Sequence, residues 1–183
     1  MKESDDHSSL PQTSPPLPAT GEAGQSIAAP GNETVRLPAG TLDFDRLSAA
    51  ANAEDAGIED KNRLWAAVFK LTQWHFIARG ELPNVRPYIA SNPGIVNGAP
   101  MLKAFTDTAR LHAFARECGL TGSHGEIHIL SLPVASIQST LDAYASQGVT
   151  HLHFNADGSS HGFYSPLVQL PIIRRHLENR GLL

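Results

Sequence analysis

The chain has little cysteine, no long apolar run and no excess of positive charge, and each shortage excludes a class of protein. Its one cysteine, Cys118, has no second thiol in the chain to pair with, so an intrachain disulfide is excluded. No segment approaches the ~20 apolar residues that cross a bilayer, and no apolar signal core lies near the amino terminus. A net charge of -4 provides no basic surface for nucleic acid. We therefore expect a cytoplasmic protein that binds neither membrane nor nucleic acid.

Residues 1–40 differ in composition from the rest of the chain. They hold six of the 13 prolines and no aromatic residue. Such a segment buries too little apolar surface to offset the entropy of ordering, which predicts a disordered leader. Residues 41–183 carry the periodic apolar patterns and predict one domain. The leader leaves open an alternative, an exported or secretion-associated protein that the leader directs.

The pattern of residues 41–183 predicts an α/β fold with a mixed sheet. Two leading helices precede a β-hairpin, a βαβαβ unit made of two crossovers, and a C-terminal helix. The expected helices cover 42–57, 59–73, 107–119 and 133–148, with a last one from 165 to beyond 177. The expected strands cover 74–79, 85–90, 101–105, 126–132 and 149–155. Pro171 is expected to kink or restart the last helix, because it lacks a backbone donor.

Two features of this pattern concern the sheet itself. Thr106 or Asp107 can cap the helix that follows the strand 101–105, since either side-chain oxygen accepts from free amides of a first helical turn. In the strand 149–155, polar His151 and His153 alternate with apolar residues. We therefore expect one face or edge of the sheet to be only partly covered.

Histidine is the enriched residue type, with nine copies. His151 and His153 lie on one side of their strand, and His128 lies on a strand that a crossover can place beside it. Three imidazoles on one sheet face form a possible zinc site with an open fourth position. A metal site also needs ordered second-shell partners, so solvated or partner-facing histidines are the preferred interpretation, and no metal is predicted.

Two residues raise the question of a nucleophile. Ser160 stands in a literal G-x-S-x-G match, but no aspartate and only one glutamate follow it, so a surface turn is the preferred interpretation. Cys118 ends an expected helix, where the helix dipole disfavours a thiolate, and is expected to be a small buried core residue. A small hydrolase or metal-binding protein that uses Ser160 or the three histidines is kept as an alternative. Phosphate-binding glycine motifs are absent, so we predict no cofactor and no catalytic residue.

Several segments together resemble the amino-terminal domain of the SseB family, the bacterial "enhanced serine sensitivity" proteins. They are the two leading helices, the strand that ends in Phe105-Thr106-Asp107, and the strand from Gly148-Val149 to Phe154-Asn155. The family typically closes this last strand with Asn-Pro, whereas Ala156 follows Asn155 here. The resemblance covers residues 42–180 and implies a small α/β domain without established catalytic residues or cofactor. Together these observations predict a non-enzymatic interaction or regulatory module that binds a protein partner or associates with itself.

Overall fold

The computed structural model describes residues 42–81, 83–91, 96–156 and 162–183, and the predicted leader lies outside them. The α-helices are α1 Phe44–Asn52, α2 Ile58–Phe69, α3 Thr108–Glu117, α4 Ile137–Ser146 and α5 Leu170–Asn179. The strands are β1 Gln73–Arg79, β2 Arg86–Pro87, β3 Ile89–Ser91, β4 Pro100–Phe105, β5 Ile129–Pro133, β6 His151–Phe154 and β7 Phe163–Pro166. Three short 3-10 helices are η1 Val96–Gly98, η2 Val134–Ser136 and η3 Leu167–Gln169.

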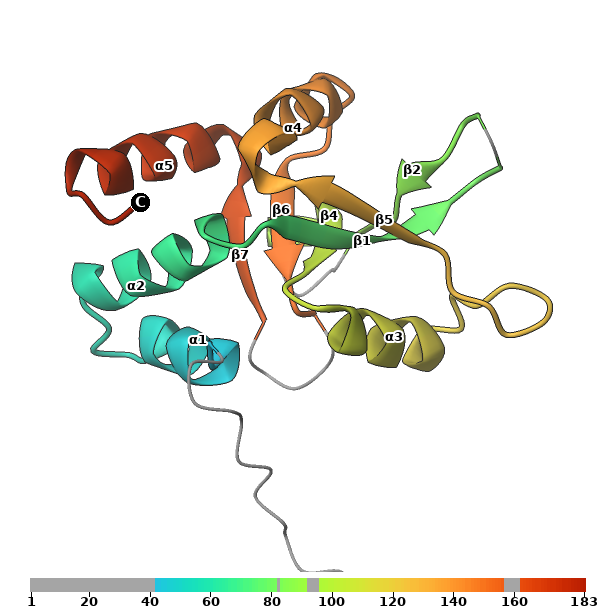
Figure 1. Cartoon of the computed structure of the whole chain (residues 1–183), viewed down its shortest axis with the longest axis horizontal. Helices are drawn as coiled ribbons and strands as arrows, with labels where there is room; N and C mark the ends of the chain where they lie inside the picture. The colour runs from blue at the N-terminus through green and yellow to red at the C-terminus, as the bar shows by residue number, and fades with distance from the viewer. Residues whose placement is uncertain (1–41, 82, 92–95, 157–161) are drawn as a thin grey trace, which may run out of the picture. The chain divides into compact units, whose positions relative to one another are not determined.

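One mixed sheet organises the chain and confirms the predicted α/β fold (Figure 1). The strand β1 pairs antiparallel with β5 along one edge and with β2 and β4 along the other. The strands β4 and β6 are parallel, and β7 pairs antiparallel with β6. The predicted hairpin is confirmed by β1 and β2, but the second predicted strand is split into β2 and β3. Tyr88, between them, donates its N–H to Ile77 and accepts from the N–H of Lys103, so it joins β1 to β4.

The predicted parallel layer needs a correction. Both crossovers exist, but β5 pairs with β1 at the far side of the sheet, so β1 and β4 separate it from β6. Among the described strands, only β4 and β6 form a direct parallel pair. The physical reason is that the hairpin strand β1 pairs with β4 on one side and with β5 on the other, and so lies between them. A crossover fixes the hand of a connection and leaves the identity of the neighbouring strand open.

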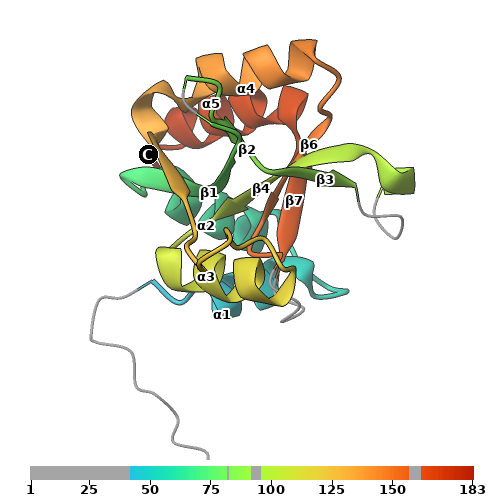
Figure 2. The same cartoon turned by 90° about the vertical axis from the view of Figure 1, so that its right-hand side faces the viewer.

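Helices cover both faces of the sheet. The helices α2, α4 and α5 pack on one face, where Leu64, Leu141 and Leu170 are buried in the larger core cluster. The helix α3 packs on the other face, where Leu111 and Phe114 are buried in a smaller cluster. Figure 2 shows the sheet between α4 and α5 on one side and α3 on the other. The sheet is thus the middle layer between two layers of helices.

Aromatic rings join α2 to the sheet in the larger core. Trp74 is fully buried, and its ring meets that of Phe154 edge to face at 5.0 Å. Its indole Nε1 donates to the carbonyl of Val68 at 3.0 Å, which satisfies the one polar atom of the ring. Trp65 lies edge to face with Phe163 at 5.6 Å. These contacts connect α2 with β1, β6 and β7.

The helix ends agree with their local sequence. Asp43 accepts from the amide of Arg46 at 3.0 Å and caps α1. Asp107 accepts from the amide of Arg110 at 2.9 Å and caps α3, which confirms the predicted cap. Pro171 lies in the first turn of α5, directly after η3, so it restarts the helix as predicted.

The strand β7 was not expected from the sequence. Ser165 and Pro166 were assigned to the opening of a helix, but they end β7 and η3 follows them. Pro133 likewise ends β5, where a first helical turn was expected. No helix among the described residues is both long and apolar enough to cross a membrane.

We predict that Leu152→Ala lowers the free energy of unfolding by about 2–5 kcal/mol, because Leu152 is fully buried on β6 and truncation leaves a cavity. Urea unfolding measures the change. Val168→Ala is the control, since Val168 is 72% exposed and its truncation should change stability by less than about 0.5 kcal/mol. Equal losses in both variants would contradict the placement of β6 in the core.

Candidate functional site

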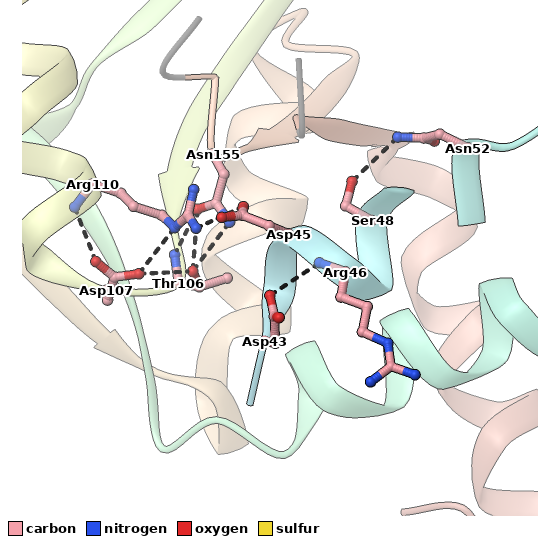
Figure 3. Close-up of polar contacts among 9 residues, drawn as sticks. All are labelled: Asp43, Asp45, Arg46, Ser48, Asn52, Thr106, Asp107, Arg110 and Asn155. Carbon is pink, nitrogen blue, oxygen red and sulfur yellow. Dashed lines mark hydrogen bonds and ion pairs between the residues drawn. The ribbon is translucent and has the colours of Figure 1, made fainter. Parts of the chain in front are cut away.

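The carboxyl ends of the parallel strands β4 and β6 are joined by side-chain hydrogen bonds (Figure 3). Asn155 Oδ1 accepts from the Thr106 backbone N–H at 3.0 Å, and Asn155 Nδ2 donates to Thr106 Oγ1 at 3.1 Å. Thr106 Oγ1 in turn lies 3.2 Å from Asp107 Oδ2 and can donate its single proton there. Both residues are buried, at 6% exposed for Thr106 and 1% for Asn155. We call this pair the Thr106–Asn155 clamp.

The clamp continues into α1 through charged groups. Arg110 Nε lies 3.3 Å from Asp107 Oδ2, and Arg110 Nη2 lies 2.6 Å from Asp45 Oδ1 on α1. Figure 3 shows Arg110 between the two carboxylates. Asn52, at the end of α1, donates to the carbonyl of Gly162 just before β7 at 3.3 Å. The helix α1 is thereby connected to α3 and to the start of β7.

This edge of an α/β sheet is where ligands commonly bind. Here its polar side chains are used internally: Asp107 Oδ1 caps α3, Asp107 Oδ2 faces Arg110, and the Asn155 amide is bonded to Thr106. Asn155 has a φ of 49°, a left-handed conformation that asparagine tolerates better than most residues. The segments on which the resemblance rests therefore lie side by side, and their hydrogen bonds hold the ends of β4 and β6 together.

The three candidate metal ligands are not brought together. His151 and His153 lie on β6, whereas His128 precedes β5, on the far side of β1 and β4. Among the described residues no group of three metal-ligating side chains is close enough to hold an ion. The two histidines of β6 are also not solvated, because His151 is 9% and His153 7% exposed. Lys103 and the ring of Tyr164 lie against them. That they face a partner stays a prediction.

Lys103 lies beside His153 on the same sheet face. Its Nζ is 2.9 Å from His153 Nδ1, and only 5% of the residue is exposed. Burial lowers the pKa of Lys103, and burial followed by the Lys103 charge lowers the pKa of His153 to about 4. A neutral imidazole with its proton on Nε2 can accept from the lysine through Nδ1. The pair is thus a buried polar contact that disfavours protonation of His153.

The structure describes one of the two nucleophile candidates, Cys118, but not the other, Ser160. Ser160 lies outside the described residues. Cys118 is exposed, so its assignment to the core is wrong; it follows the last residue of α3 as the C-cap. Loss of hydration and then the Glu117 carboxylate raise the pKa of the Cys118 thiol, which disfavours a reactive thiolate.

A serine–histidine pair escaped the sequence analysis. Ser131 Oγ lies 2.8 Å from His75 Nδ1, because the two residues face each other across β5 and β1. Burial lowers the pKa of His75, with a smaller opposing effect from Asp107. Asp107 is the acid that could orient this imidazole, but its oxygens already serve Arg110 and Thr106. The pair therefore lacks the third group of a catalytic triad.

An open groove lies between α2, β7 and α5, and no sequence pattern predicts it. We call it the α2–α5 groove; its volume is about 420 Å³. It is lined by Ile58, Lys61, Asn62, Trp65, residues 164–166, Gln169, Ile172, Ile173 and His176. Two of these are large apolar side chains that are strongly exposed, Ile58 at 62% and Ile172 at 68%. Tyr164 borders the groove, but its ring lies against His151 and His153 on the other face of the sheet. A second pocket adjoins it and shares Lys61, Trp65 and Tyr164.

The groove contrasts with the clamp in that one of its buried polar groups has no partner. Asn62 is 5% exposed, and its Nδ2 has no hydrogen-bond partner among the described residues. An unsatisfied buried donor costs about 1–3 kcal/mol. Apolar walls with a few polar groups are the composition that is typical of ligand-binding sites.

Comparison with protein-family models, curated proteins and solved structures finds no match to this chain. The resemblance to the SseB family therefore stays a prediction, and the function is argued from the geometry alone.

We predict that Asn155→Ala lowers the free energy of unfolding by about 2–4 kcal/mol, because it leaves the buried Thr106 amide unpaired and strains a left-handed residue. Asn155→Gly removes the same hydrogen bonds without that strain and should retain about 1 kcal/mol more stability. Urea unfolding of both variants tests this. An alanine variant as stable as the natural protein would show that the clamp contributes nothing.

Acid sensitivity follows from His153. Its folded pKa, about 4, is below the ordinary value of 6.5, so between these values the unfolded chain binds more protons. The stability that His153 contributes is complete above pH 6.5 and falls as the pH decreases toward 4. We expect a loss of about 2–3 kcal/mol from this group between pH 7.5 and 4.5. Urea unfolding of His153→Gln should show a shallower acid dependence; an unchanged slope would contradict the assignment.

Proposed function

We propose that residues 42–183 form a non-enzymatic, cytoplasmic interaction module, of the type that the SseB resemblance implies, which binds a protein partner through the α2–α5 groove. The observation that carries this proposal is the groove itself. It combines exposed Ile58 and Ile172 with an unpaired buried amide on Asn62. Isolated exposed apolar side chains are ordinary, whereas a group of them around a hollow is typical of an interaction surface.

The arrangement of the polar groups supports binding over catalysis. The acid nearest to the Ser131–His75 pair is engaged by a helix cap and an arginine. The histidines of β6 are buried beside Lys103. The hydrophilic edge at the ends of β4 and β6 is closed by the clamp. Among the described residues these groups thus have structural roles, and the groove is left for a partner.

A peptide-display selection on the full chain tests the proposal. We expect the selected peptides to lose at least about tenfold in affinity for Ile172→Asp, because the charge enters an apolar wall. Val168→Asp is the matched control: Val168 is also exposed and lies just before α5, but it does not line the groove. Affinities are measured by titration calorimetry.

Two results would contradict the proposal. One is that the selected peptides bind both variants as tightly as the natural chain, which would place the interaction elsewhere. The other is turnover in a panel of ester and phosphate substrates that disappears in Ser131→Ala. That result would make the Ser131–His75 pair catalytic and the protein an enzyme.

A further inference from the structure

The α2–α5 groove carries charge of one sign. Lys61 is the only Asp, Glu, Lys or Arg among its described lining residues, and it lines the adjoining pocket as well. The neighbouring carboxylates of α2 are engaged elsewhere: Glu59 lies 2.6 Å from Arg180 and Asp60 lies 3.2 Å from Arg63. Within the described part of the chain Lys61 itself has no ion-pair partner. A carboxylate entering the groove would meet an unpaired ammonium group and no wall carboxylate.

The next residue of α2 supplies an independent indication. Asn62 lines the same groove and has a buried Nδ2 donor without a partner, which a ligand can reach if the side chain turns toward the groove. A carbonyl oxygen is the acceptor that satisfies an amide donor. A peptide backbone carries such an acceptor at every residue. The groove is therefore suited to a polypeptide ligand.

The edge of the sheet indicates the conformation of that polypeptide. Leu167 donates its N–H to Thr150 at 2.9 Å, and His153 faces Tyr164 in the register of β6 and β7. Because antiparallel residues alternate between bonded and outward-facing pairs, the backbone N–H and C=O of Tyr164 point away from β6. Among the described strands none pairs with this side of β7.

This free edge is short. Pro166 has no N–H to offer, and the carbonyl of Gly162 already accepts from Asn52. Only Tyr164 thus provides both backbone groups to a ligand. A short extended segment can use one such residue, whereas the edge is too limited to continue the sheet through a second copy of the chain.

We propose that the groove binds a short extended segment of another protein that carries a bulky apolar side chain and a neighbouring carboxylate. This inference rests on the proposed function and specifies its ligand. The apolar side chain packs against Trp65 and Ile172, and the carboxylate pairs with Lys61. The backbone bonds to the backbone of Tyr164 and to the amide of Asn62, whose side chain turns toward the groove on binding.

The test uses two synthetic peptides and the full chain. Both peptides alternate leucine with a charged residue, which is aspartate in one and lysine in the other. We expect the aspartate peptide to bind about tenfold more tightly, and Lys61→Glu to reverse this preference. Lys70→Glu is the matched control, because Lys70 is an exposed lysine at the end of α2 that does not line the groove. The indole N–H signal of Trp65 in NMR spectra should shift with the aspartate peptide.

A second variant separates binding from folding. Asn62→Leu replaces the unpaired amide by an apolar group of similar shape, so thermal unfolding should show no loss of stability. The affinity for the aspartate peptide should fall about fivefold, because the peptide carbonyl loses its donor. An unchanged affinity in Asn62→Leu would overturn the role of the amide.

Other outcomes decide the rest of the inference. Three results would each overturn the inference. They are equal binding of both peptides, tighter binding of a helical peptide with the same composition, and groove-dependent dimerisation in sedimentation experiments. These failures are distinguishable from failure of the proposed function. Selected peptides that depend on Ile172 but contain no carboxylate would leave the interaction module intact and remove only the acidic, extended ligand.

Discussion

Burial of the two tryptophans is the constraint on which the structure depends. Trp74 is enclosed between α2 and the sheet and bonds to the carbonyl of Val68. Trp65 packs against Phe163 on one side and lines the α2–α5 groove on the other. The same ring thus belongs to the core and to the surface that we propose for binding. Because interiors are close-packed, the core holds this part of the groove in place, and a ligand meets a largely preformed wall.

The polar groups of the domain are satisfied in one region and left unpaired in another. At the ends of β4 and β6, Thr106, Asp107, Arg110 and Asn155 bond to one another and connect α1 to the sheet. Such internal satisfaction stabilises a fold and leaves no group available for a substrate. In the α2–α5 groove the balance is reversed, since Asn62 is unpaired and apolar side chains are exposed. This contrast within one domain supports binding at the groove.

Much of the fold could be predicted from the sequence, and the site could not. The helices were predictable because each carries several turns of apolar periodicity, as Leu64 and Val68 do in α2, and Asp107 has the chemistry of a cap. The strand β7 was missed because four residues ending in Pro166 give too short a pattern. The position of β5 was missed because the hand of a crossover does not specify which strand lies beside β5. For the same reason the grouping of His128 with His151 and His153 was wrong. The groove brings Ile58 and Ile172 together from distant parts of the chain. Local sequence patterns do not predict contacts between such distant residues.

The central claim is that this α/β domain acts by binding through the α2–α5 groove and not by chemistry. Hydrogen–deuterium exchange of the full chain, with and without a display-selected peptide, measures this most directly. The account predicts slower exchange at the Tyr164 amide and at the start of α2, with no change at Thr106. Protection at Thr106 and Arg110 without any change around Tyr164 would contradict it.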